Sequence, residues 1–351
     1  MTPPNVHPLD LAGLTQQVLR PWWEVVLAGY AAQDPAPPVD SLPEMTAGLR
    51  AAAAGYRQPV LAGVHDPATG RPAGFAVAWL PQRDNTSSMQ VDPLVVHPAF
   101  RRRGLGTALL DHLVTIAREA GRTVLLLEST EPIGSDGTAV AGTAFARAAG
   151  AVDVAMAVQR TLDVQPAADE PAGPAGPAGP GDSAVAPGYE LLAWTDATPD
   201  ELMAPMAVLR ALMSVDAPGE DMTLQPEVWD ADRVRAEDAR TSSAGRTSST
   251  TAARHARTGA LVGYTELVVS RTVPAVAFQG DTFVLGAHRG HGLGLAMKQA
   301  NQRRFRALSP ATRTVHTWNA AVNDHMVAIN DALGFRPTAQ ERGLELRIPA
   351  G

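Results

Sequence analysis

A glycine-containing motif occurs twice in this sequence, and this repeat constrains the fold more than any other feature. The first copy, "AFRRRGLGTALLDH", covers residues 99–112, and the second, "AHRGHGLGLAMKQA", covers residues 287–300. Each contains Arg-x-x-Gly-x-Gly and continues into a helical pattern of apolar residues. The second copy lies 188 residues after the first. The spacing indicates an internal duplication rather than one large domain.

The surrounding sequence supports the duplication. "ATGRPAGFAVAWL" in the first half parallels "RTGALVGYTELVV" in the second, with an offset of 189 between the two Thr-Gly pairs. Between the halves, residues 165–188 are rich in Pro, Gly and Ala, which predicts an exposed linker because such a segment cannot form a core. We therefore expect a domain at residues 1–164, the linker, and a second domain at residues 189–351. A length of 351 residues with 45% hydrophobic content agrees with two cores.

Composition excludes several classes of function. The net charge of -7 gives no overall basic field for nucleic acid. Without any cysteine, the chain cannot form disulfides, thiolate zinc sites or acyl-cysteine intermediates, and we expect no metal. The first residues show no signal-peptide pattern, and no apolar run reaches the about 20 residues that span a bilayer. We expect a cytoplasmic protein without nucleic-acid or membrane partners; the sequence does not indicate its oligomeric state.

Hydrophobic patterns predict the same order of elements in each half. A helix comes first, then a two-stranded hairpin around the Thr-Gly turn, a third strand, the glycine motif with its long helix, a further strand, a second helix and a final strand. Apart from the long helix, the elements of the first half are expected at residues 14–30, 58–64, 74–80, 91–98, 122–130, 138–150 and 152–162. Those of the second half are expected at residues 201–215, 248–256, 263–270, 281–287, 312–320, 323–335 and 343–349. Residues 241–246 are expected to form a loop. The order predicts an α+β (mixed α/β) fold.

The glycine motif has the chemistry of an anion-binding turn. The first N–H groups of a helix have no intrahelical partners and lie at the positive end of the helix dipole, where a phosphate accepts several hydrogen bonds. Glycine lets the backbone approach the anion, and arginine can bond phosphate oxygens bidentately. The residues expected to bind the anion are Arg101, Arg102, Arg103, Gly104, Leu105, Gly106 and Thr107 in the first copy and Arg289, Gly290, His291, Gly292, Leu293, Gly294 and Leu295 in the second.

Three other interpretations compete with this one. A tight strand-to-helix turn with solvated arginines would show the same motif. A Walker A loop is excluded because no Gly-Lys-Ser/Thr follows. A dinucleotide-binding turn needs a third glycine where Leu109 and Met297 stand, although Glu128 could imitate its ribose-binding acid. The second half has Trp318 or Asn319 at that place, which disfavours a nicotinamide or flavin enzyme.

At these residues the sequence resembles the GNAT superfamily of acetyl-CoA-dependent N-acyltransferases. The family signature Arg/Gln-x-x-Gly-x-Gly/Ala follows its fourth strand, as in "VVHPAFRRRGLGTALL" and "HRGHGLG", and "NAAVNDHMVAINDALGF" resembles its Asn-led helix that ends in Leu-Gly-Phe. The tandem layout is similar to that of mycothiol synthase, although nothing in the sequence indicates that substrate. The resemblance implies two tandem GNAT-like domains, each a mixed, mostly antiparallel sheet with splayed central strands flanked by helices.

The resemblance also implies where acetyl-CoA binds. The family's fourth and fifth strands splay apart, and the pantetheine arm lies beside the fourth like an added strand. The pyrophosphate would lie on the two glycine turns. The further residues expected at the cofactor are Leu94, Val96, Val284, Leu285, Asn319 and Asn323. Asn323 has an alternative role as the cap of the helix that follows it.

Transfer of an acyl group from a thioester to an amine requires a base, stabilisation of an oxyanion and departure of a thiolate. Because cysteine is absent, we expect direct attack in a ternary complex. Asp281 and Glu266 are the candidate bases in the second half, and Asp92 is the counterpart in the first. Each is alternatively an ordinary turn or edge-strand residue. His316 is a further candidate, and a backbone N–H near Leu285 is expected to stabilise the oxyanion.

The chain departs from the family at the general acid. Many members have a tyrosine four residues before the glycine of Leu-Gly-Phe, where this sequence has Asn330 and, in the first half, Ala146. Asn330 can donate a hydrogen bond to sulfur but cannot release a proton, and Tyr264 is a possible substitute from the other side. Because the second half keeps more polar candidates, we expect it to be the catalytic half and the first to bind acetyl-CoA or serve as a packing partner.

The predicted function is N-acetyltransferase activity, from acetyl-CoA to a primary amine of a small molecule or peptide. The acidic balance of the chain suits a cationic acceptor. The alternative is a non-catalytic acetyl-CoA-binding sensor or assembly module, because neither half has the usual acid. The two hypotheses differ in whether thiol is released from bound acetyl-CoA.

Overall fold

The computed structural model describes residues 4–33, 35, 37–53, 55–164, 185–216 and 222–349. Most of the predicted linker, residues 165–184, therefore lies outside the described residues. The chain forms two compact units, each with one glycine motif and each made of separate segments of the sequence. Unit 1 comprises Met1–Val158, Gly219–Pro226 and Thr338–Gly351, and unit 2 comprises Gln159–Pro218 and Glu227–Pro337.

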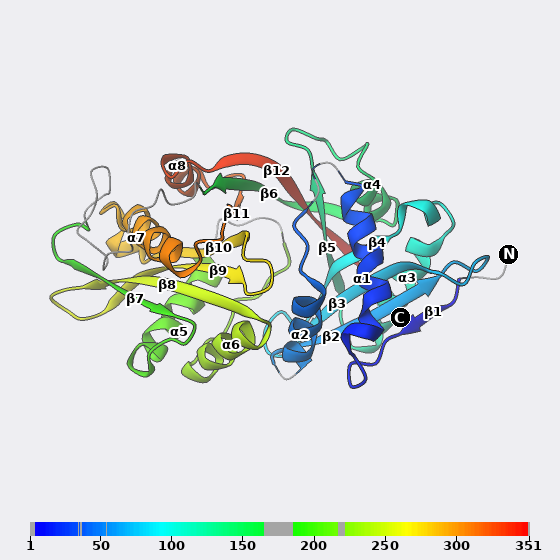
Figure 1. The fold of residues 1–351 in the computed structure, drawn as a ribbon, viewed down its shortest axis with the longest axis horizontal. Coiled ribbons are helices and arrows are strands. Elements are labelled where there is room, and N and C mark those ends of the chain that lie inside the picture. The colour runs from blue at the N-terminus through cyan, green and yellow to red at the C-terminus, as the bar shows by residue number, and fades with distance from the viewer. Residues whose placement is uncertain are drawn as a thin grey trace. The chain divides into compact units, whose positions relative to one another are not determined.

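The sheet of unit 1 has the strand order β1-β2-β3-β4-β5-β12 (Figure 1). The pair β4–β5 is parallel, and the other pairs are antiparallel. The strands are β1 (Val6–Pro8), β2 (Arg57–His65), β3 (Pro72–Pro81), β4 (Ser88–Val96), β5 (Val124–Glu131) and β12 (Arg336–Arg347). This sheet is mixed and mostly antiparallel, as the sequence predicts.

Helices cover both faces of this sheet. Successive residues of a strand point to opposite faces, and Leu61 of β2 packs with α1 (Gln16–Ala31) and α2 (Leu42–Ala53), whereas Ala62 packs with α3 (Leu105–Glu119). The short helix α4 (Ala141–Ala148) contributes to the same core as α3. The glycine motif thus connects the end of β4 to the helix that covers one face.

Unit 2 repeats this arrangement with the strand order β6-β11-β10-β9-β8-β7, in which β10 and β11 are parallel. Its strands are β6 (Val152–Asp163), β7 (Tyr189–Thr195), β8 (Arg246–His255), β9 (Leu261–Ser270), β10 (Val276–Val284) and β11 (Thr314–Ala320). Its helices are α5 (Asp200–Asp216), α6 (Ala231–Ser243), α7 (Leu293–Leu308) and α8 (Asp324–Ala332). Tyr264 and Val262 of β9 pack with the α5–α6 side and the α7 side, respectively.

Each unit completes its sheet with a strand from the other half of the sequence. β12, at the end of the chain, pairs with β5 of unit 1 from Gln340↔Glu131 to Arg347↔Val124. The end of β6, from the first half, belongs to unit 2 and neighbours β11. The sequence predicts both strands, but the hydrophobic pattern of a strand does not indicate in which sheet it pairs.

The helices α2 and α6 lie where the sequence predicts no helix. The expectation of a loop at residues 241–246 is wrong, because α6 extends to Ser243 and β8 begins at Arg246. The side chain of Asp230 caps α6 by accepting a hydrogen bond from the N–H of Arg233. The remaining residues of α6 are mostly polar, so the helix lacks the apolar periodicity by which a surface helix is usually found.

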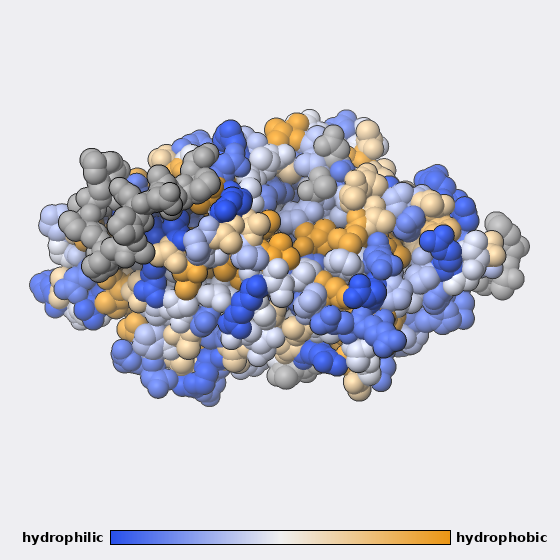
Figure 2. All heavy atoms as spheres, viewed as in Figure 1, coloured by the Kyte–Doolittle hydropathy of each residue, from blue (hydrophilic) through white to orange (hydrophobic). Residues whose placement is uncertain are grey.

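Hydrophilic and apolar side chains are interspersed over the displayed face of the molecule (Figure 2). Within the described ranges, no helix is both long enough and apolar enough to cross a bilayer.

Candidate active site

In both units, the strand before the glycine motif separates from its parallel neighbour partway along its length. β4 pairs with β5 from Ser88 to Val91 but stays paired with β3 up to Val96. β10 pairs with β11 from Val276 to Phe278 and with β9 up to Val284. We call these separations the splays. In each unit a β-bulge lies at the start of the splay, in the pairing with the other neighbouring strand. It is at residues 92–93 of β4, opposite β3, and at residues 280–281 of β10, opposite β9.

Within each splay, alternate backbone groups of β4 or β10 point away from β3 or β9, the strand with which it is still paired. His97 and Leu285 donate their N–H groups to the carbonyls of Ala73 and Val262, both at 2.8 Å. Because pairing alternates along an antiparallel ladder, the N–H and C=O groups of residues 94, 96 and 284 face the splay. The expected positions Leu94, Val96 and Val284 are thus on the correct side for an added strand.

The expectation for Leu285 needs correction. Its N–H is already bonded to Val262, and its side chain packs among apolar residues of unit 2. This N–H is therefore not available to an oxyanion, and the N–H of the preceding residue, Val284, is the group that faces the splay.

The two glycine turns have the same backbone conformation. Gly104 and Gly292 have φ of 78° and 68°, the left-handed region that favours glycine, and each is the N-cap of the following helix without any side-chain cap. Two residues earlier, Arg102 and Gly290 also have positive φ, 64° and 78°. The first N–H groups of α3 and α7 therefore lack a side-chain acceptor and remain available to an anion.

The following glycine of each turn leaves space for a neighbouring helix. A Cβ on Gly106 would lie 3.4 Å from the ring of Phe145 on α4, and one on Gly294 would lie 3.1 Å from Cδ1 of Ile329 on α8. The side chains of Leu105 and Leu293 are buried, so these residues offer only backbone to a ligand. Thr107 is exposed and Leu295 is half-buried.

The leading arginines point back toward their strands. Nε of Arg101 donates to the carbonyl of Val96 at 3.2 Å, and Nε of Arg289 donates to the carbonyl of Val284 at 3.0 Å. The guanidinium of Arg289 also pairs with Asp216 at the end of α5. In this structure the two arginines fix the ends of the splayed strands rather than extend toward a phosphate.

The other side chains of the turns differ between the units. Arg103 pairs with the buried Asp66 at 3.0 Å and lies over the ring of Phe100, while Arg102 is exposed. In unit 2 the corresponding residues are Gly290 and His291, whose Nδ1 lies 3.0 Å from the carbonyl oxygen of Arg289. The first turn is therefore more basic than the second.

Two predicted carboxylates of unit 2 lie near each other at the splay. The hydroxyl of Tyr264 donates to Asp281 at 2.9 Å, and Arg210 of α5 donates to Glu266 at 3.1 Å. Burial raises the pKa of Glu266, while Arg210 opposes that shift. Asp281 is exposed, so of the two it is the carboxylate with direct access from solvent.

Tyr264 is fully buried, and burial followed by the charge of Asp281 raises its pKa well above the usual value. Its hydroxyl is already donated to Asp281. The interpretation of Tyr264 as a substitute acid is therefore wrong for this structure, because the hydroxyl orients a carboxylate instead.

Unit 1 has a similar pair, in which the tyrosine comes from a helix and not, as in unit 2, from the neighbouring strand. The hydroxyl of Tyr30, on α1, lies 3.5 Å from Asp92 in the bulge of β4. Although Asp92 retains solvent access, the surrounding chain desolvates its carboxylate and raises its pKa to about 6, with further contributions from Glu128 and Asp40. The sequence does not indicate this contact of Tyr30, because a tyrosine near a helix end shows no sign of a strand partner 62 residues away.

The remaining predicted residues have defined partners. The side chain of Asn323 accepts from the N–H of Met326 at 3.1 Å, so in this structure it caps α8. Asn330 is fully buried and donates to Asn319 of β11. His316 lies in the paired part of β11, and its Nδ1 contacts Thr161 and Gln159 of β6 at 2.9 and 3.1 Å, away from the splay.

A second residue missed by sequence reasoning is Lys298 of α7. Its Nζ donates to Oδ1 of Asn330 at 2.6 Å, and its side chain is almost completely buried. Within the described residues no group of three or more His, Cys, Asp or Glu side chains is arranged to hold a metal.

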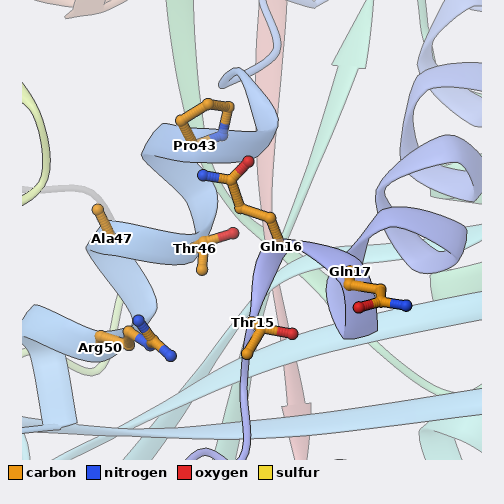
Figure 3. Close-up of a pocket in the computed structure, with 7 residues that line it drawn as sticks. All are labelled: Thr15, Gln16, Gln17, Pro43, Thr46, Ala47 and Arg50. Atoms are coloured by element: carbon orange, nitrogen blue, oxygen red, sulfur yellow. The ribbon is translucent and has the colours of Figure 1, made fainter.

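A pocket of about 460 Å³ lies elsewhere in unit 1, between the start of α1 and α2 (Figure 3). It is lined by Thr15, Gln16, Gln17, Pro43, Thr46, Ala47 and Arg50. The other end of α1 contacts the glycine turn, because the carbonyl of Gly29 accepts from Arg101. At 1.5 Å per residue, about 20 Å of helix separates this pocket from the turn, so it is not part of the candidate active site.

The fold and site define a class: a tandem protein with two splayed sheets, in each of which the splayed strand leads into a glycine turn at the start of a helix. The model of the acetyltransferase (GNAT) family matches residues 28–134, which lie in unit 1. A tandem GNAT protein from the clavulanic acid biosynthesis pathway (without AcCoA) is 30% identical, with a TM-score of 0.76 and coverage of 99% of both chains. This chain therefore belongs to the GNAT superfamily, as a tandem member.

A more distant neighbour has the same fold. A GCN5-related N-acetyltransferase from Sphaerobacter thermophilus is 16% identical, with a TM-score of 0.65 and coverage of 99% of this chain and 96% of that one. No curated protein matches the sequence. Membership of the family supports acyl transfer from an acyl-CoA as the general activity of the chain.

Proposed function

We propose that the protein transfers an acetyl group from acetyl-CoA to a primary amine of a small molecule or peptide, by direct attack in a ternary complex. The observation that carries the proposal is the recurrence, in both units, of a splayed strand followed by a left-handed glycine at a helix N-terminus. A diphosphate fits the N–H groups of such a turn, and an extended arm fits beside the strand.

In this proposal each turn binds a pyrophosphate through its backbone, from Arg101 to Thr107 and from Arg289 to Leu295. Leu94, Val96 and Val284 offer backbone groups to the pantetheine arm. The acyl-CoA supplies an activated thioester, and the chain supplies position, a base and hydrogen-bond donors.

We assign the chemistry to unit 2, with Asp281 as the base. An ammonium does not attack a carbonyl, so the acceptor must first give a proton to Asp281, directly or through water. The amine nitrogen then bonds to the acyl carbon and gives its second proton to water, and the carbon–sulfur bond breaks with its electron pair on sulfur. The charges of Glu266 and Arg210 determine the electrostatic potential around Asp281. The N–H of Val284 faces the splay, where it can donate to the acyl oxygen as that oxygen becomes negative.

The boundaries 1–164, 165–188 and 189–351 remain our proposed division of the sequence, with the catalytic half at the C-terminal end. The carboxylates at the splays, Asp281 and Glu266 in unit 2 and Asp92 with Glu128 in unit 1, favour a cationic acceptor such as a polyamine or an aminoglycoside.

The test is release of thiol from acetyl-CoA over a panel of primary amines, including spermidine and an aminoglycoside. We expect turnover with at least one amine and a loss of turnover in Asp281→Asn. Uptake of acetyl-CoA without turnover on any amine would favour the alternative, a non-catalytic sensor or assembly module.

A further inference from the structure

The only lysine of the sequence is buried inside unit 2. Lys298 is 1% exposed, and its Nζ lies 2.6 Å from Oδ1 of Asn330, 4.0 Å from Sδ of Met326 and 5.6 Å from the ring centre of Phe335. None of these neighbours titrates. Within the described residues Lys298 has no ion pair, and burial lowers its pKa to about 7.

Packing does not explain a lysine at this place. Lys298 is the sixth residue of α7, and the sixth residue of α3 is Leu110, which fills the same position in unit 1. Asn330 corresponds to Ala146, four residues before a positive-φ glycine in each unit. Burying an ammonium group costs several kcal/mol that a leucine does not cost. The lysine and its asparagine are thus a polar addition to a core that is apolar in unit 1.

The chemistry of the three side chains fixes the direction of their hydrogen bonds. An ammonium group can only donate, so Oδ1 of Asn330 must face Lys298. The Nδ2 of Asn330 is then the donor to Oδ1 of Asn319. The remaining donor of this chain of bonds is Nδ2 of Asn319.

Asn319 lies three residues beyond His316, the last residue of β11 that pairs with β10. Its place on the strand is therefore in the splay, on the strand opposite Val284. Ile329, the neighbour of Asn330 on α8, packs against Gly294 of the glycine turn. The hydrogen-bonded chain thus connects the interior of unit 2 with the proposed site of the acyl-CoA.

We propose that Lys298 is a positioning residue, which through Asn330 holds the amide of Asn319 as a hydrogen-bond donor to the departing thiolate. This role rests on the proposed acetyl transfer in unit 2, and it replaces the acid that the chain lacks. The first proton of the ammonium goes to Asp281 and the second goes to water once the nitrogen has bonded to the acyl carbon; the carbon–sulfur bond breaks, and the thiolate accepts a hydrogen bond from Nδ2 of Asn319. It gains its own proton from solvent after release. A neutral lysine also accepts hydrogen bonds, so the orientation weakens above pH 7.

A single lysine makes the test direct. The full chain, labelled with [ε-13C]lysine, gives one lysine NMR signal, which is followed during titration with acetyl-CoA in a Gly104→Val background that removes the first turn. We expect the signal to titrate near pH 7 and to shift at saturation. In Asn319→Ala the shift should disappear, while calorimetry should still show uptake of acetyl-CoA because the turn still binds the pyrophosphate.

Kinetics separate positioning from a merely structural role. Lys298→Met should lower kcat about 10- to 100-fold with little change in KM, and should abolish the decline of kcat above pH 7. Leu110→Met is the matched control in unit 1 and should change neither. Bound acetyl-CoA with an unmoved lysine signal, or an unchanged pH profile in Lys298→Met, overturns the inference alone. No uptake of acetyl-CoA overturns the proposed function, and the inference with it.

Discussion

The two units have the same backbone at the splay and the glycine turn but different chemistry around it. Unit 1 has three consecutive arginines at its turn, and Asp92 has a pKa raised to about 6. Unit 2 has a turn of glycines and one histidine, with the pairs Tyr264–Asp281 and Arg210–Glu266 and the buried Lys298 behind them. The difference teaches that two units with the same backbone geometry at the splay can surround it with different ionisable side chains.

The units also differ in how they hold the strand that comes from the other half. In unit 1, Arg342 of β12 makes two hydrogen bonds, at 2.8 and 2.9 Å, to the fully buried Glu131 of β5. In unit 2, Arg160 of β6 pairs with Asp331, whose side chain is 56% exposed. A buried ion pair loses far more than an exposed one when one partner is removed.

The largest expected effect is therefore on stability. Glu131→Ala should destabilise the protein by about 3–5 kcal/mol, because Arg342 and Gln340 lose a buried acceptor. Asp331→Ala, the matched change in unit 2, should cost less than about 1 kcal/mol. Urea denaturation of both variants measures the difference. Equal losses would show that the two exchanged strands are held alike.

The next effect concerns which unit is catalytic. Asp281→Asn keeps the acceptor for Tyr264 but removes the base, and should lower kcat by a factor of about 10²–10³. Asp92→Asn should change kcat less than about threefold. The opposite ranking, together with a rate that falls below pH 6 and loses this dependence in Asp92→Asn, would move the chemistry to unit 1. The family match to residues 28–134 makes that reversal a serious alternative.

A smaller effect concerns the buried lysine. Because burial lowers the pKa of Lys298 from 10.5 to about 7, the unfolded chain binds a proton between these values that the folded chain lacks. The stability of the wild type therefore rises as pH increases from 7 to 10.5. Lys298→Met removes this contribution and should be more stable than the wild type at pH 7, by about 1–3 kcal/mol.

Leu110→Met, at the same position of unit 1, should change stability by less than about 1.5 kcal/mol at either pH. Denaturation at pH 7 and pH 10 checks both variants. A Lys298→Met protein that is less stable at pH 7, with the same pH dependence as the wild type, would contradict a desolvated ammonium.

The sequence predicts the parts of the site that depend on local backbone chemistry. The glycines at 104 and 292 need a conformation that other residues rarely adopt, and the aspartates at 92 and 281 lie where a strand must bend. The glycine and the aspartate therefore occur at corresponding places in both halves of the sequence. The sequence also predicts the mixed sheet, because hairpin strands and a strand–helix–strand unit have distinct periodicities.

The rest depends on contacts between distant segments. The pairing of β12 with β5 follows from tertiary structure, because the hydrophobic pattern of a strand does not identify the strand with which it pairs. Tyr30 reaches Asp92 from another element, and Arg101 turns toward a strand carbonyl instead of outward. Of the two site residues that were missed, Tyr30 and Lys298, only Lys298 is recognisable in the sequence, as a charged residue on the apolar face of an amphipathic helix.

The most direct test of the central claim is calorimetric titration of the full chain with acetyl-CoA. We predict two binding sites in the wild type, one in Gly104→Val, one in Gly292→Val and none in the double variant. Gly121→Val and Gly245→Val are the controls, because those glycines also have positive φ, 70° and 77°, but follow the ends of α3 and α6 instead of standing in a glycine motif. Absence of any uptake by the folded wild type, or two sites persisting in Gly292→Val, would contradict the claim that the paired glycine turns bind the pyrophosphate.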